Sequence, residues 1–130
     1  HSDYGLEDLG FKQQFELFEL VKHRSGIVPP VIDSEDLMKK PRKALKNLCR
    51  IIDIGFSESM LSWKPGSKPY DGIWGNHWYK EINKSDRFRK TPFSDRSSRE
   101  RSRMSVKELD IIKEADRYYQ HLYKIRINLD

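Results

Sequence analysis

The chain contains only one stretch that resembles a β-strand, and this scarcity of strands limits what it can fold into. Residues 27–32 form a short apolar run that leads to Asp33, and Pro29 and Pro30 remove two backbone donors near its start. One strand cannot form a sheet, so the helices around it must pack on each other or on chain outside this sequence. We therefore expect this chain alone to be mostly α-helical, with one or two short strands.

Three segments have the apolar spacing of amphipathic helices. Residues 6–23 carry a stripe of Phe11, Phe15, Phe18 and Val21. A second helix is expected to begin with Pro41 in its first turn and to end at Gly55. Its apolar face contains Ala44, Leu45, Leu48, Cys49 and Ile52. A third helix is expected from Ser105, which has capping-box spacing to Glu108, with a stripe at Leu109, Ile112, Ala115, Tyr119 and Leu122.

The chain between the second and third helices carries weaker signals. Ser57 is expected to cap a short helix through Leu61, residues 63–75 to form a loop rich in Pro, Gly and aromatic residues, and residues 77–82 to form a helical turn. Residues 84–103 contain five serines and no apolar periodicity, so we expect a mobile loop. This suggests three parts: a domain portion at 1–83, a basic Ser/Arg-rich segment at 84–104, and a terminal helix at 105–130 that packs back on the domain.

The net charge of +5 is concentrated in one segment. Residues 84–103 contain eight basic and three acidic residues, whereas the other 110 residues contain 17 of each sign. A basic excess is typical of proteins with polyanionic partners. Because the excess is local, the alternative function that it supports is a small helical interaction module whose basic arm, residues 84–103, binds nucleic acid or an acidic partner.

The sequence also excludes several classes. It has no apolar run long enough for a membrane span and no signal-peptide pattern, so we expect a soluble, cytoplasmic protein. Cys49 is the only cysteine, which excludes an intrachain disulfide and favours a small core residue. The chain begins with His1 instead of Met, so we expect that a segment upstream is missing.

Residues 31–56 contain Glu35-Asp-Leu followed by a helix with Pro41-x-x-x-Leu45, and this block resembles the P-loop sulfotransferase family. Further segments look like the C-terminal half of bacterial sulfotransferase-like proteins: residues 10–18, 60–63 and 72–79, and the terminal helix.

The resemblance implies a doubly wound α/β domain that binds 3′-phosphoadenosine 5′-phosphosulfate and transfers its sulfuryl group to a hydroxyl or amine of a small-molecule acceptor. In that family a Gly-rich loop cradles the 5′-phosphosulfate with backbone donors. This chain contains no Gly-x-x-x-x-Gly-Lys-Ser/Thr pattern. We therefore expect it to be the C-terminal portion of such a protein and to be inactive by itself.

Candidate site residues follow from their chemistry and from the resemblance. His77 has a side chain able to take a proton from an acceptor hydroxyl, although a packed or surface histidine is the simpler interpretation. Trp74 and Trp78 are candidates for stacking on a substrate, or they clamp a helix onto the core. Glu35 and Asp36 are interpreted as structural carboxylates at a helix start.

The basic segment at 84–103 has three interpretations: a solvated linker, an arm that binds nucleic acid, or a lid over an anionic cofactor. For the lid, the resemblance suggests Arg87, Arg89 and Lys90 as contacts to the 3′-phosphate, although the family's Arg-Lys-Gly pattern is absent. The histidines His1, His23 and His121 are too scattered for a metal triad, so no metal is predicted.

Overall fold

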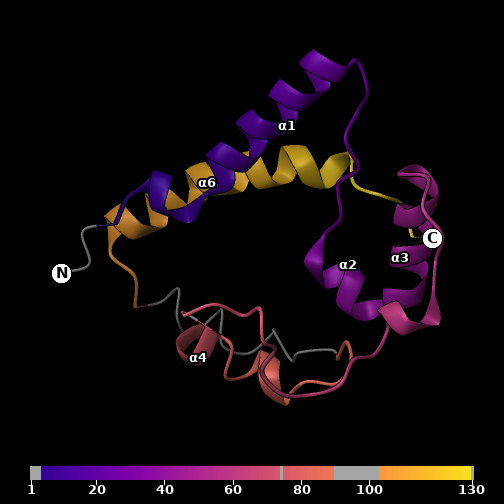
Figure 1. Cartoon of the computed structure of the whole chain (residues 1–130). Coiled ribbons are helices and arrows are strands. Elements are labelled where there is room, and N and C mark those ends of the chain that lie inside the picture. The colour runs from indigo at the N-terminus through magenta and orange to yellow at the C-terminus, as the bar shows by residue number, and fades with distance from the viewer. Residues whose placement is uncertain (1–3, 74, 90–102, 130) are drawn as a thin grey trace. The chain divides into compact units, whose positions relative to one another are not determined.

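The computed structural model describes residues 4–73, 75–89 and 103–129, and within these ranges the protein is mostly helical (Figure 1). No β-strand occurs in this described part, where one isolated antiparallel bridge joins Ser62 to Arg87. The expectation of a strand at 27–33 is therefore wrong. The prolines remove two N–H groups, and the described chain offers no partner strand beside this segment. Val31 accepts a backbone bond from Ile127 at 2.8 Å instead.

The chain forms two compact units, each described here by itself. The first unit contains residues 1–33 and 92–128, and the second contains residues 34–91 and 129–130. The second unit is thus inserted between two segments of the first along the sequence. Among the described helices, none is both long enough and apolar enough to cross a bilayer.

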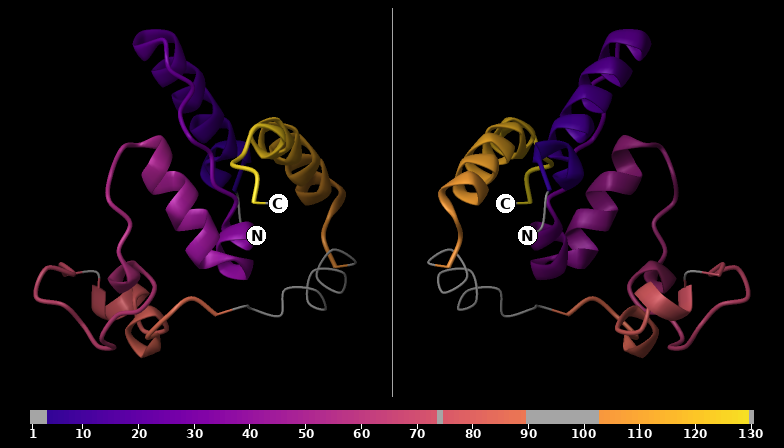
Figure 2. Two further views of the ribbon diagram at one scale, coloured as in Figure 1. Left: turned by 90° about the vertical axis from the view of Figure 1, so that its right-hand side faces the viewer. Right: turned by 90° about the vertical axis from the view of Figure 1, so that its left-hand side faces the viewer.

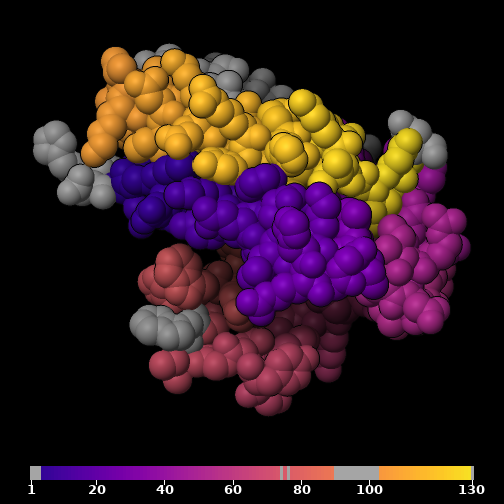
Figure 3. Space-filling model, turned by 90° about the horizontal axis from the view of Figure 1, so that it is seen from above, coloured from indigo at the N-terminus to yellow at the C-terminus, as the bar shows by residue number. Residues whose placement is uncertain are grey.

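The first unit is built on two helices, α1 (Phe11–Ser25) and α6 (Val106–Lys124), which lie side by side (Figures 1 and 3). A 3₁₀ turn, η1 (Leu6–Leu9), precedes α1 and also contacts α6. Aromatic rings fill the seam between the helices: the Phe11 and Tyr119 centroids are 6.3 Å apart, and those of Phe15 and His121 are 4.9 Å apart. Phe18, Ala115 and Leu122 are buried. The stripe predicted for α6 and the residues Phe11, Phe15 and Phe18 of the stripe predicted for α1 are thereby confirmed, whereas Val21 is 42% exposed.

The start of α6 is fixed by the capping box that the sequence predicts. Ser105 Oγ accepts a bond from the backbone N–H of Glu108, while Glu108 Oε2 accepts one from the backbone N–H of Ser105 at 2.7 Å. The Tyr4 hydroxyl donates to Glu108 Oε1 at 3.0 Å. These bonds, the one from the Ser105 backbone first, hold the pKa of Glu108 below its usual value.

The second unit begins with α2 (Ser34–Lys39), which places Glu35 and Asp36 in its first turn, and α3 (Pro41–Ile51). Proline stands at the start of α3, as the sequence predicts. Cys49 is buried, which confirms it as a core residue. After α3 the chain continues through short helical turns, η2 (Glu58–Met60), α4 (Gly75–Trp78) and η3 (Ile82–Lys84), joined by irregular segments (Figure 2). Ser57 caps η2 as expected, accepting from the backbone of Ser59.

The end of α3 differs from the expectation that Gly55 would close it. The helix ends at Ile51, and Asp53 adopts the left-handed conformation with φ 56°. The backbone N–H of Ile54 donates to the carbonyl of Cys49 at 2.9 Å, which is the long bond of a Schellman motif. Aspartate tolerates this conformation better than most non-glycine residues, so the helix ends before the glycine is reached.

Candidate functional site

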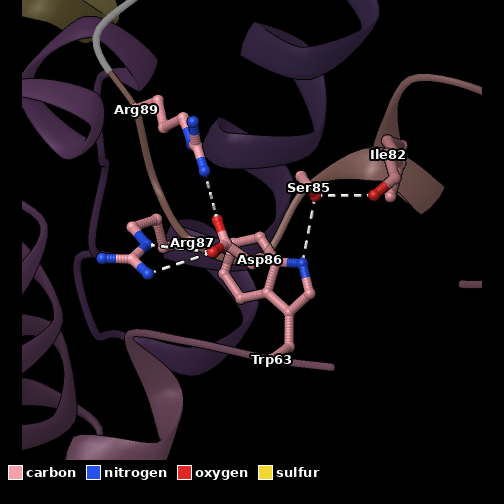
Figure 4. A network of polar contacts seen from close by, with 6 residues as sticks. All are labelled: Trp63, Ile82, Ser85, Asp86, Arg87 and Arg89. Atoms are coloured by element: carbon pink, nitrogen blue, oxygen red, sulfur yellow. Dashed lines mark hydrogen bonds and ion pairs between the residues drawn. The ribbon is translucent and has the colours of Figure 1, made fainter. Parts of the chain in front are cut away.

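The candidate site centres on Asp86, whose carboxylate holds two arginines (Figure 4). Oδ2 accepts from Arg87 Nε at 3.2 Å and from Arg87 Nη2 at 3.0 Å, and Oδ1 accepts from Arg89 Nη2 at 2.8 Å. The Asp86 side chain is 29% exposed, whereas the arginine side chains are 64% and 69% exposed. The carboxylate therefore positions two guanidinium groups whose remaining donors face solvent.

These contacts change the electrostatics of the group. The hydrogen bonds from Arg87 and then Arg89 lower the pKa of Asp86 to about 2. The same pair raises the pKa of Arg87 above its usual value. The cluster of Asp86, Arg87 and Arg89 thus keeps a net positive charge at all ordinary pH values, and this charge suits an anionic ligand.

Trp63 anchors the segment that carries this cluster. Its backbone N–H donates to the Asp86 carbonyl at 2.8 Å, next to the bridge between Ser62 and Arg87. Its indole Nε1 donates to Ser85 Oγ at 3.0 Å, and Ser85 Oγ donates to the Ile82 carbonyl at 2.6 Å (Figure 4). The Phe88 ring packs edge-on against the indole with centroids 5.2 Å apart. The aromatic loop of the sequence therefore supplies a structural anchor for the arginines.

Arg87 also lines a pocket of about 620 Å³ that lies within the second unit. The start of α3 forms one side of the pocket, and residues 87–88 with Leu61 form the rest. Its lining residues are cationic or apolar: Lys40, Pro41, Arg42, Lys43, Lys46, Leu61, Arg87 and Phe88. The pocket is therefore lined by cations from two segments that are more than 40 residues apart in sequence.

The other predicted site residues lie elsewhere in the second unit. His77 and Trp78 belong to α4, their rings meet edge to face with centroids 5.0 Å apart, and Trp78 is 69% exposed. Gly75 lets this turn form, because a Cβ there would lie 2.8 Å from Asp71 Cβ. Neither His77 nor Trp78 lines the pocket beside Arg87. Trp74 and Lys90 lie outside the described residues.

Sequence reasoning selected the arginines from the local charge excess together with the family resemblance, but it missed Asp86 and the basic start of α3. A signal for the latter was present, since residues 39–46 contain five cations and no acidic residue. Counting charge over the 110 residues outside 84–103 conceals this cluster, because acidic residues elsewhere cancel it.

Two further predictions concern a metal site and nucleic acid. Within the described ranges, no group of three or more His, Cys, Asp or Glu residues is arranged to hold a metal ion. Nucleic acid binding through residues 84–103 stays a prediction, because residues 90–102 lie outside the described chain.

Comparison with known proteins gives a family match over most of the chain. Residues 2–122 match a family model described as a sulfotransferase domain. The chain is also similar to branched-chain-amino-acid aminotransferase-like proteins 1 and 2 of Arabidopsis thaliana, with 43% and 40% identity over 63 residues. These 63 residues are 48% of this chain but only 11% of each relative. No solved structure matches the chain.

Proposed function

The chain belongs to the sulfotransferase domain family, and from that premise we propose that it is the C-terminal portion of a protein that transfers a sulfuryl group from 3′-phosphoadenosine 5′-phosphosulfate to a hydroxyl or amine acceptor. The complete domain is proposed to have the doubly wound α/β fold, with the phosphosulfate cradle supplied by residues outside this chain. The absence of a Gly-x-x-x-x-Gly-Lys-Ser/Thr sequence supports this division. Aminotransferase chemistry is not proposed, because the matched residues are a small part of those relatives.

The paired arginines on Asp86 are the observation that supports a nucleotide donor. Arg87 and Arg89 are held by one carboxylate and keep exposed guanidinium donors. Guanidinium groups bind phosphate oxygens through charge-assisted, often bidentate, hydrogen bonds. We assign these two residues, with Lys90, to the 3′-phosphate of the donor.

The transfer itself requires an attacking atom, a leaving group and a destination for one proton. The acceptor oxygen or nitrogen attacks sulfur, the bond between sulfur and the bridging phosphate oxygen breaks, and adenosine 3′,5′-bisphosphate leaves with that electron pair. The acceptor's proton passes to a general base, for which His77 is proposed. The exposed ring of Trp78 and the side chain of Trp74 are proposed to contact the acceptor.

Calorimetric titration of the full-length protein with adenosine 3′,5′-bisphosphate tests this function. Replacing Arg87→Ala together with Arg89→Ala should weaken binding by about tenfold or more, because each removes a charge-assisted bond. The matched control replaces Arg24→Ala and Arg117→Ala, which are exposed arginines on α1 and α6. This control should leave the affinity within about twofold, as expected for exposed residues outside the site. The absence of binding heat at millimolar nucleotide would refute the proposed function.

A further inference from the structure

The pocket at the start of α3 contains cations in addition to Arg87, the arginine that Asp86 holds. Five of its eight lining residues are cations, and none is acidic. Two of these cations have carboxylate partners nearby, since Arg42 pairs with Glu58 and Arg87 pairs with Asp86. With both carboxylates counted and Lys40 left out of the sum, Lys43 and Lys46 still give the pocket a net charge of +2. A pocket with this surplus favours an anion with more than one negative charge.

Within the described chain, no carboxylate compensates the charges of Lys43 and Lys46, two residues of α3 that line the pocket. Neither makes an ion pair within the described part of the chain. The ammonium group of Lys46 lies 5.3 Å from the centroid of the Phe56 ring, and this contact restrains the side chain without neutralising it. Lys40 is restrained through a bond from Nζ to the Leu129 carbonyl at 3.2 Å. Restrained cations lose less side-chain freedom when a ligand binds, which favours affinity.

The rest of the lining is apolar and includes one fixed aromatic ring. Phe88 is held edge-on against Trp63, and Leu61 and Pro41 complete the apolar part. Binding pockets commonly combine an apolar lining with a few polar groups that orient the ligand. The pocket therefore offers an apolar surface beside a group of cations.

We propose that this pocket binds a phosphate or sulfate ester of an apolar or aromatic group, with Lys43 and Lys46 contacting the oxyanion from α3 and Arg87 contacting it from the opposite segment. The inference deepens the proposed function, because the ester belongs either to the donor nucleotide or to an acceptor that already carries phosphate or sulfate. The ligand chemistry is the same for both sources. Only the organic group attached to the oxyanion differs.

Nuclear magnetic resonance on the full ¹⁵N-labelled chain tests the proposal with two probes, phenyl phosphate and adenosine 3′,5′-bisphosphate. Saturable shifts are expected for the backbone signals of Lys43, Leu61 and Phe88, and for the indole N–H of Trp63 behind the Phe88 ring. The substitutions Lys43→Glu and Lys46→Glu, made together, reverse two charges and should weaken binding by at least about tenfold, since each lysine supplies a charge-assisted bond. The milder pair Lys43→Gln and Lys46→Gln guards against misfolding and should weaken binding in the same direction.

The matched control is Lys64→Glu together with Lys80→Glu. Both lysines are exposed, belong to the same unit and lie outside the pocket. It changes the net charge by the same amount and should leave the affinity within about twofold. If the binding of both probes depends on Lys43 and Lys46, the result supports an ester pocket that is open to acceptors. If only the binding of the nucleotide depends on them, the ester belongs to the donor.

Other outcomes overturn the inference or separate it from the proposed function. The pocket proposal is refuted if neither probe causes saturable shifts at these signals, or if the control pair weakens binding as much as the α3 pair. Nucleotide binding that is lost with Arg87→Ala and Arg89→Ala but not with the lysine changes leaves the proposed function standing and removes the pocket. If phenyl phosphate binds and depends on Lys43 and Lys46 but the nucleotide does not bind, the pocket proposal stands and the proposed function is refuted.

Discussion

At the scale of single residues, Asp86 orients both arginines of the candidate site. Its two oxygens hold Arg87 and Arg89 in fixed positions, and its backbone carbonyl accepts from Trp63. The sequence showed the arginines as part of a charge excess. It gave no reason to select Asp86 from the three acidic residues in 84–103, because a sequence does not show which carboxylate has the rotamer that reaches both neighbouring arginines.

Removal of Arg87 should raise the pKa of Asp86. In the folded protein this pKa is lowered from 3.8 to about 2, mainly by the bond from Arg87 and then by that from Arg89. The stabilising contribution of these contacts is therefore complete above the unfolded value and is lost as pH falls through about 2. With Arg87→Ala, carboxyl-carbon resonances should show Asp86 titrating closer to 3.8.

The control for this measurement is Arg42→Ala, because the carboxylate partner of Arg42 is Glu58. This change should leave the titration of Asp86 where it is in the unmodified protein. If Asp86 already titrates at its ordinary value in the unmodified protein, the two arginines are not held as described.

His77 should affect the rate of transfer more than nucleotide affinity. It does not line the pocket that Arg87 lines, so His77→Ala should leave the affinity for adenosine 3′,5′-bisphosphate unchanged. Loss of a general base should lower the rate by about 100-fold or more in the full-length protein. His23→Ala on α1 is the matched control. An unchanged rate would show that His77 is only a surface residue.

At the scale of elements, a buried residue of the seam between α1 and α6 should contribute more to stability than an exposed one. Leu122 is 7% exposed, whereas Leu17 on α1 is 59% exposed. Leu122→Ala leaves a cavity and should lower the free energy of unfolding by about 2–5 kcal/mol. The same change at Leu17 should alter it by no more than about 0.5 kcal/mol. Denaturant titration of both variants measures this difference, and equal effects would contradict the packing of the seam.

The sequence predicted the long helices better than the short elements. The stripes of α1 and α6 extend over several turns, so periodicity identifies them and the capping box marks a boundary. The six residues of α2 are too few to show a helical period, and the apolar run before Asp33 predicts a strand that does not form. A strand depends on a hydrogen-bonding partner elsewhere in the chain, and a local apolar run carries no information on whether that partner exists.

At the scale of the whole molecule, the charge distribution has to be considered in space. The sum over the chain outside 84–103 is zero, yet four cations of residues 40–46 meet Arg87 in one pocket. Arg87 comes close to residues 40–46 because residue 87 pairs with residue 62 in the isolated bridge. No sequence pattern in residues 40–46 or near residue 87 indicates that these two segments lie together, so the candidate pocket was not predictable from the sequence.

The two units should open independently in hydrogen exchange. The first has its core at Phe18, Ala115 and Leu122, and the second has a separate core at Ala44 and Cys49. Because amides exchange through cooperative local units, a cavity in one core should lower protection only in the elements that share it. Leu122→Ala should therefore speed exchange in α1 and α6 while α3 keeps its rates, and Leu17→Ala should change neither. If α3 speeds up in parallel with α6, the chain unfolds as one cooperative body despite its two cores.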